Sequence, residues 1–342
     1  MASNLLKFNV GTWKTVNPLN RKQTLISPLL FSRDHHYCYS NNSYFSSSFS
    51  HKPLTPSLHI HSSLSSSNSN PPTTKDEAIL QAKTCLAATL EKPLNSPKFA
   101  GKFKKLKQPK FQVEIPLIDD SSTSISQLAF DVFINIPTKR KGSTVKITII
   151  WPSSKLKDEA IEVFQSHPLH NITHVDISAA KGGDARILNS AEVAVFMAPE
   201  SSQLSVVKIV SDSLYPKPVV MFNPRWGFEE ESEFGELSEF LRSFEVIYSF
   251  MGLEVRGVLS KRKGVVFKCV RDGVVSGEKW SVLVEEEEED KGELKVVSRF
   301  KTRPSIGEVE NVLYNLMAIN SPITKSAKFL RDLISNVTGK KN

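Results

Sequence analysis

Between residues 144 and 252 the chain alternates short, almost wholly apolar runs with longer stretches of helical periodicity. The apolar runs are rich in β-branched residues, which is typical of parallel strands that helices cover on both faces. The alternation therefore predicts an α/β fold with a Rossmann-like, mostly parallel sheet of four or five strands in this part. The expected strands are 144–151, 171–178, 192–199, 217–223 and 245–252, and the expected helices between them are 155–167, 201–215 and 236–244.

Segments on either side extend this pattern into one module over residues 75–340. On the N-terminal side, Thr74 and Glu77 have the spacing of a capping box, and apolar residues follow at helical spacing as far as Glu91. A strand at 111–118 and a helix at 124–136 are expected next.

After residue 252 the pattern changes to strand-like runs joined by turn-like pieces, such as KRKG at 261–264 and the acidic run at 286–292. This spacing predicts an antiparallel meander that extends the sheet. Two helices, 305–320 and 323–337, are expected to close the chain.

The first 70 residues differ in composition from the rest. Of the formal net charge of +8, the first 74 residues carry +5, which leaves +3 for the other 268. This segment is rich in Ser and Asn and contains no Glu, a composition typical of an organellar transit peptide. A disordered tail is the alternative. We expect a chloroplast transit peptide over 1–70, cleaved near 60–75, and a soluble mature protein in the stroma.

Local motifs for familiar chemistries are missing from the sequence. It has no GxxxxGK[ST], GxGxxG, GxSxG or HExxH pattern, so no cofactor and no enzymatic activity are expected. His167, His170 and His174 are close in sequence, but Pro168 interrupts them, and surface or half-buried histidines are favoured over a metal site. Cys85 and Cys269 are expected to be buried thiols, because they lie far apart and form no CxxC motif.

Two polar segments in the first half of the module are candidates for binding. Lys181, Gly182 and Gly183 follow an expected strand and can hold an anion through their amides and the ammonium group. The alternative is a tight turn with Asp184 as the N-cap of the next helix. The lysine-rich run at 98–110 can contact RNA, an acidic protein surface or lipid headgroups, or it is a solvated linker.

The stretch 219–231, VVMFNPRWGFEEE, is the third candidate. Asn223 lies at the carboxyl end of an expected central strand, where ligands gather in open α/β sheets. Arg225 can bind a carboxylate or phosphate, and Trp226 can stack on a ring or anchor a partner. The structural alternative is that Arg225 pairs with one of Glu229–Glu231 while Trp226 packs over the sheet end.

Three stretches resemble a plant and cyanobacterial family known only as a domain of unknown function. They are VVMFNPRW (219–226), FEVIYSFMGLEVRGVLSKRKGVVFKCVRDG (244–273) and TRPSIGEVENVL (302–313), and the resemblance extends over residues 75–335. The family includes chloroplast proteins required for photosystem II accumulation and is also appended to a chloroplast adenylate kinase. The resemblance implies a Rossmann-like fold but no catalytic residues, and because the P-loop is missing it implies no kinase activity.

The resemblance implies a non-enzymatic stromal factor that assists photosystem II assembly or accumulation. Its expected partner is a photosystem II subunit or another assembly factor, with peripheral contact to the thylakoid. The alternative is a small-ligand or nucleotide-binding regulatory module that uses Gly182, Gly183 and Arg225. RNA binding through the lysine run is the weakest alternative, because the body of the protein is nearly neutral.

Overall fold

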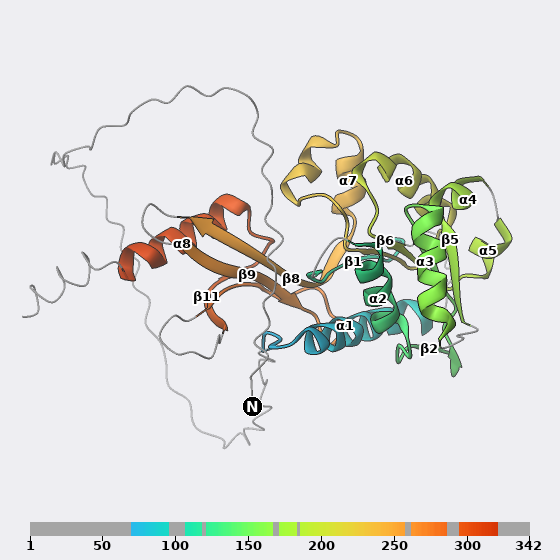
Figure 1. Ribbon diagram of the computed structural model, residues 1–342, viewed down its shortest axis with the longest axis horizontal. Coiled ribbons are helices and arrows are strands. Elements are labelled where there is room, and N and C mark those ends of the chain that lie inside the picture. The colour runs from blue at the N-terminus through green and yellow to red at the C-terminus, as the bar shows by residue number, and fades with distance from the viewer. Residues whose placement is uncertain are drawn as a thin grey trace, which may run out of the picture. The chain divides into compact units, whose positions relative to one another are not determined.

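The computed structural model describes residues 70–95, 107–117, 121–166, 171–182, 185–256, 261–285 and 294–320 (Figure 1). The predicted transit peptide, residues 98–106 of the lysine-rich run and the second predicted C-terminal helix lie outside this part of the chain. So do Gly183, His167 and His170. The boundaries 1–70 and 75–340 therefore stay predictions.

A nine-stranded sheet dominates the structure, in the order β11-β10-β9-β8-β1-β7-β6-β4-β5. The strands from β8 to β5 in this order are parallel, and β9, β10 and β11 continue the sheet as an antiparallel meander. This confirms the predicted fold class. The strands are β1 Lys110–Glu114, β4 Ile147–Trp151, β5 Ile172–Asp176, β6 Val193–Met197, β7 Val219–Phe222, β8 Glu245–Arg256, β9 Lys261–Cys269, β10 Trp280–Glu285 and β11 Leu294–Phe300, beside a separate hairpin of β2 Lys139–Arg140 and β3 Ser143–Thr144.

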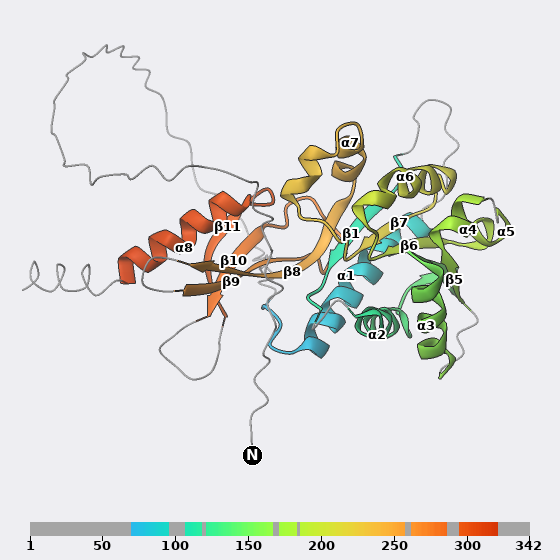
Figure 2. The same ribbon diagram turned by 45° about the horizontal axis from the view of Figure 1, so that its top comes forward.

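Helices lie on both faces of the parallel part of the sheet, as Figure 2 shows. Helices α1, α2 and α3 cover one face, and α4, α6 and α7 cover the other, while α8 packs against the meander. The helices are α1 Lys75–Asn95, α2 Ser122–Phe133, α3 Ser154–Gln165, α4 Ile177–Gly182, α5 Ala185–Ser190, α6 Leu204–Ser213, α7 Leu237–Arg242 and α8 Ile306–Asn320, with 3-10 turns η1 Ser201–Gln203 and η2 Glu229–Glu233.

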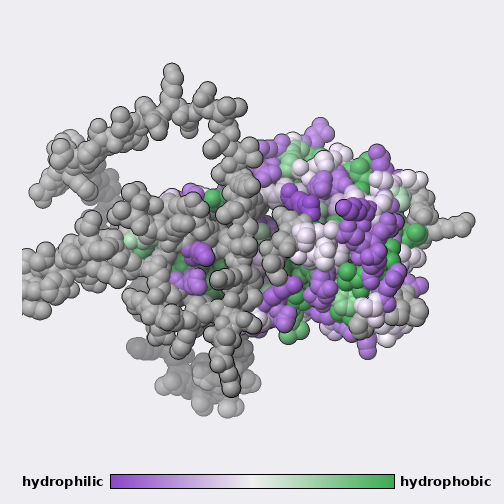
Figure 3. All heavy atoms as spheres, viewed as in Figure 1, coloured by the Kyte–Doolittle hydropathy of each residue, from purple (hydrophilic) through white to green (hydrophobic). Residues whose placement is uncertain are grey.

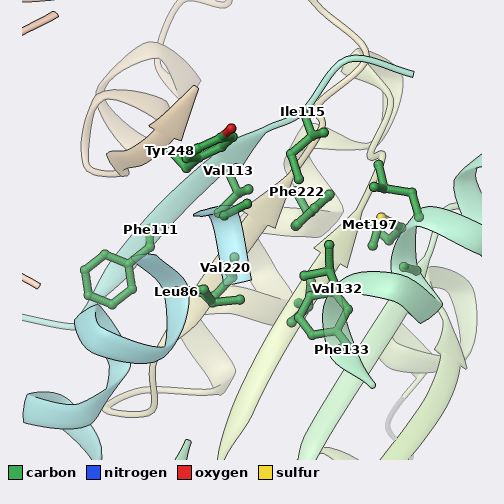
Figure 4. Close-up of a cluster of buried hydrophobic side chains, with 14 of the residues drawn as sticks. Leu86, Phe111, Val113, Ile115, Val132, Phe133, Met197, Val220, Phe222 and Tyr248 are labelled. Carbon is green, nitrogen blue, oxygen red and sulfur yellow. The ribbon is translucent and has the colours of Figure 1, made fainter. Parts of the chain in front are cut away.

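Two hydrophobic cores explain why the central strands β4, β6 and β7 have no polar face. In β7, Val220 and Phe222 point to the core under α1 and α2, whereas Val219 and Met221 point to the core under α6. Figure 4 shows the first core, in which side chains of β1, β7 and β8 meet Leu86 of α1. Each residue of β4, β6 and β7 is therefore buried on one side or the other, and these apolar runs are continuous.

The helix starts follow from the sequence. Ser121 and Ser153 cap α2 and α3, because their side chains accept hydrogen bonds from backbone amides three residues on. The Thr74 hydroxyl accepts the Glu77 amide as predicted, but the Glu77 carboxylate accepts the amide of Thr73.

Three local expectations were wrong. The predicted turn at 261–264 is the first part of β9. Helix α1 continues through Pro93 to Asn95, since a proline in the last turn removes only one backbone hydrogen bond. Residues 177–182 form α4 instead of the end of a strand and a loop. None of the described helices has the length and apolar composition that a membrane span requires.

Candidate functional site

The loops at the carboxyl ends of β1, β4, β6 and β7 are joined to one another by hydrogen bonds. Asn223, which follows β7, has a φ of 46°. Its side-chain amide donates to the carbonyl of Ile115 over 2.8 Å and its oxygen accepts the Ile115 amide over 2.7 Å. Asn tolerates this left-handed conformation better than most residues. Asn223 therefore joins the end of β7 to the end of β1.

The backbone of Arg225 is held by a hydrogen bond, whereas its side chain is exposed. Its amide donates to the carbonyl of Pro199, which follows β6. The guanidinium lies 3.8 Å from Glu200, and the two side chains are 37% and 50% exposed. A pair this long and this exposed contributes little to stability. The partner predicted for Arg225 was one of Glu229–Glu231, and the structure places Glu200 there instead.

Hydrogen bonds also connect the loop after β6, which contains Glu200, to the carboxyl end of β4. Glu200 and Gln203 form a capping box at η1, and the Gln203 amide group donates to the carbonyl of Pro152 over 2.7 Å. Hydrogen bonds thus link the loop around Arg225 to the end of β1 and to the loop after β6, and that loop is linked in turn to the end of β4.

Trp226 lies in the interior. Its side chain is 7% exposed and belongs to the core under α6 and α7, where its ring meets Phe234 edge to face at 6.2 Å. This placement matches the structural alternative for Trp226. A ring buried in this way holds the loop to the sheet and is not presented to a partner.

A buried ion pair between Arg303 and Glu114, which the sequence did not indicate, lies next to this loop. Arg303 donates to both carboxylate oxygens of Glu114, the last residue of β1, at 2.7 and 3.0 Å. The side chains are 14% and 7% exposed. Glu114 also accepts hydrogen bonds from Gln112 and Ser249, each over 2.7 Å, so the buried carboxylate is well satisfied.

Arg303 connects the stretch TRPSIG to Phe228, two residues after NPRW. Its guanidinium lies over the ring of Phe228, 4.4 Å from the centroid, and 5.2 Å from that of Trp280. Near Arg303, burial raises the pKa of Glu231, and the Glu114 carboxylate raises it further, whereas the positive charge of Arg303 lowers it. Residues 223–231 and residue 303 thus form one structural unit, which we call the edge loop.

The segment around Lys181 and Gly182 has a different geometry from the one proposed for anion binding. Helix α4 begins directly after β5, where Asp176 accepts the amides of Ser178 and Ala179. Lys181 and Gly182 are exposed in its last turn, where carbonyl oxygens and not amides are free. Gly183 lies outside the described residues, so the anion site stays a prediction.

His174 lies on β5 between rings. Its Nδ1 accepts a hydrogen bond from Trp151 Nε1 over 3.1 Å, and its ring centroid is 4.6 Å from that of Phe164. Burial lowers the pKa of His174 to about 4, so the imidazole is neutral. Within the described residues, no cluster of three or more His, Cys, Asp or Glu is arranged to hold a metal ion.

Acidification should destabilise the fold through His174. Between its ordinary pKa of 6.5 and the folded value of about 4, the unfolded chain binds a proton that the folded chain does not. Stability is therefore full above pH 6.5 and falls as the pH decreases to 4, by roughly 3 kcal/mol at most. Urea unfolding from pH 7 to pH 4 measures this. His174→Gln, which keeps an acceptor but cannot titrate, should flatten the profile, and equal slopes would contradict the assignment.

The described end of the lysine-rich run folds back onto the domain. The Lys110 ammonium lies 4.6 Å from the ring centroid of Phe240, and burial lowers its pKa. Lys107 remains exposed, 3.8 Å from Glu245. Lys110 therefore belongs to the packing of α7 against the sheet, and its charge is not displayed freely.

The fold and the edge loop define a Rossmann-like α/β protein whose sheet continues into an antiparallel meander. Residues 72–311 match the family described as Domain of unknown function (DUF1995), and the chain belongs to this family. No curated protein matches it. Among solved structures, the flagellar accessory protein FlaH from Methanocaldococcus jannaschii is 9% identical over 56% of this chain and 88% of that chain, with a TM-score of 0.25. A similarity of that size supports no inference about this chain.

Proposed function

We propose that this chain is a non-enzymatic chloroplast stromal factor that assists the assembly or accumulation of photosystem II. Family membership and the resemblance to chloroplast proteins required for photosystem II accumulation support this proposal. Among these, the chain resembles the third low photosystem II accumulation protein. Its partner is a photosystem II subunit or another assembly factor, which it meets in the stroma or at the thylakoid surface.

The observation that carries the proposal is the edge loop, whose hydrogen-bonded backbone carries exposed charges of both signs. Asn223 and buried Trp226 hold the backbone, while Arg225, Glu229 and Glu230 are exposed. A loop that is already ordered loses little conformational entropy when it binds a partner. Charged groups around such a loop select the partner's surface by complementarity.

The surface shown in Figure 3 is consistent with a polar partner. Where it is not grey, it carries many purple hydrophilic residues, and the green apolar patches among them are small and separate. Small separate apolar patches are usual on soluble proteins and do not indicate a docking site. We assign recognition to the charged edge loop because its backbone is held by hydrogen bonds while its charged side chains are exposed.

Replacing Arg225 by alanine should weaken partner binding without unfolding the protein. We expect a change in the free energy of unfolding below about 1 kcal/mol, because the pair with Glu200 is exposed. We expect an approximately tenfold loss in recovery of the photosystem II partner, as for a central interface arginine. Quantitative mass spectrometry after affinity purification from stromal and thylakoid fractions measures this.

The matched control is Lys146→Ala, because Lys146 is exposed directly before β4, at the opposite edge of the sheet. It removes one positive charge far from the edge loop in sequence and should leave recovery unchanged. Equal recovery with Arg225→Ala and wild type would exclude Arg225 from the interface. A thermal-shift screen with nucleotides and sugar phosphates tests the ligand-binding alternative, which requires a rise of about 2.7 kcal/mol in stability at 100 times the dissociation constant.

A further inference from the structure

Two buried thiols from distant parts of the chain lie in contact. Cys85 Sγ on α1 and Cys269 Sγ at the end of β9 are 3.4 Å apart, although 184 positions separate them in the sequence. Both are free cysteines, 0% and 2% exposed. The sequence predicted that they are buried, but their separation gave no reason to expect this contact.

The contact lies where α1 packs on the sheet. Helix α1 covers β8 and β9, and Tyr248 of β8 pairs directly with Cys269 in the strand register. The backbone is close nearby as well, because a Cβ added to Gly273 would lie 2.5 Å from the carbonyl oxygen of Ala88. The two sulfurs are held together by this packing. A disulfide has a sulfur separation of about 2.05 Å, so bond formation needs a movement of little more than 1 Å.

We propose that Cys85 and Cys269 are an oxidation site, and that a peroxide converts them to a reversible intramolecular disulfide that links α1 to β9.

The reaction proceeds in two balanced steps. The Cys269 thiolate attacks one oxygen of hydrogen peroxide, so that an S–O bond forms, the O–O bond breaks and the released hydroxide takes up the thiol proton to leave as water. The Cys85 sulfur then attacks the Cys269 sulfur, so that the S–S bond forms, the S–O bond breaks and a second water leaves with the Cys85 proton. The two thiols lose two electrons, which reduce peroxide to two waters.

The surroundings of the two sulfurs determine which one attacks peroxide and which one resolves the intermediate. The hydrogen bond from the Cys85 thiol lowers the pKa of Cys269, and the side chain of Arg271 lowers it further. The pKa of Cys85 is raised by the same hydrogen bond and by burial. Cys269 is therefore the thiolate that attacks peroxide, and Cys85 is the resolving thiol.

Oxidation is expected to be slow and to make the fold more resistant to heat. Both thiols are buried, so peroxide reaches them only by entering the interface between α1 and the sheet or when α1 opens locally. The disulfide closes a very long loop and therefore restricts the unfolded chain strongly. We expect the Tm to rise by about 5 °C or more.

The test uses the full chain with Cys38→Ser, because Cys38 is the only other cysteine in the sequence. Hydrogen peroxide is added to the folded protein, remaining thiols are alkylated, and peptides are mapped by mass spectrometry without reduction. We expect both thiols to disappear together, a cross-linked Cys85–Cys269 peptide to form, the Tm to rise, and dithiothreitol to reverse all three changes. Cys85→Ala in the same background should abolish the cross-link and lead to higher oxides at Cys269.

Two results would overturn the proposal. One is that both thiols remain reduced under conditions in which peroxide oxidises them in the urea-unfolded chain. The other is that one cysteine is converted to a sulfinic acid while the other stays reduced. Both results come from the chain with Cys85 and Cys269 intact, so they do not depend on whether the Cys85→Ala variant folds.

Discussion

Arg303→Ala will lower the free energy of unfolding by about 3–5 kcal/mol, because it leaves the buried Glu114 carboxylate without its cation. Glu114 is only 7% exposed, and the bonds from Gln112 and Ser249 remain but do not neutralise its charge. The substitution also removes the guanidinium stacked on Phe228. Urea unfolding followed by tryptophan fluorescence measures the loss.

Two further variants separate this charge effect from a general effect of substitution. Lys301→Ala removes an exposed positive charge two residues away and should change stability by less than about 0.5 kcal/mol. Adding Glu114→Gln to Arg303→Ala should recover part of the loss, because a neutral amide needs no cation. A loss with Arg303→Ala no larger than that of the control would show that the pair does not join the edge loop to β1.

Gly273→Ala should also have a large effect and lower the free energy of unfolding by about 2–5 kcal/mol. Gly273 has a φ of 71°, and an added Cβ would lie 2.5 Å from the carbonyl oxygen of Ala88 and 2.9 Å from its carbon. Both contacts are with the backbone of α1, so no side chain can rotate away. Thermal and urea unfolding would show a lower Tm and a lower denaturant midpoint.

Gly235→Ala is the control for backbone conformation alone. Gly235 has a φ of 56°, but nothing lies within 4 Å of an added Cβ. It should therefore destabilise by only about 1–2 kcal/mol. If the two variants were equally destabilised, the close packing of α1 on the loop after β9 would be contradicted, and only the strain of a positive φ would remain.

The fold class could be predicted because it depends on local patterns. Val219 and Met221 face one core while Val220 and Phe222 face the other, so the strand is apolar along its whole length. The position of β1 between β7 and β8 could not be predicted. That pairing joins segments more than 100 residues apart, and hydrophobic periodicity holds no information about which strands are neighbours.

The position of Asn223 at the carboxyl end of a parallel strand could be predicted, because the apolar run of β7 ends just before it. That a ligand or partner binds there stays a prediction. The partners of the side chains after Asn223 were not predictable, since Glu200 and Arg303 are remote in sequence from Arg225 and Phe228. The contact between Cys85 and Cys269 was missed for the same reason.

The content of assembled photosystem II in chloroplasts that lack this protein is the most direct test of its proposed role. Complexes are separated on native gels after pulse labelling, with wild-type chain or Arg225→Glu restored in parallel. We predict that assembled photosystem II falls without the protein, recovers with the wild type and fails to recover with Arg225→Glu, although that variant accumulates normally. Unchanged assembly of photosystem II in the absence of the protein would contradict the account.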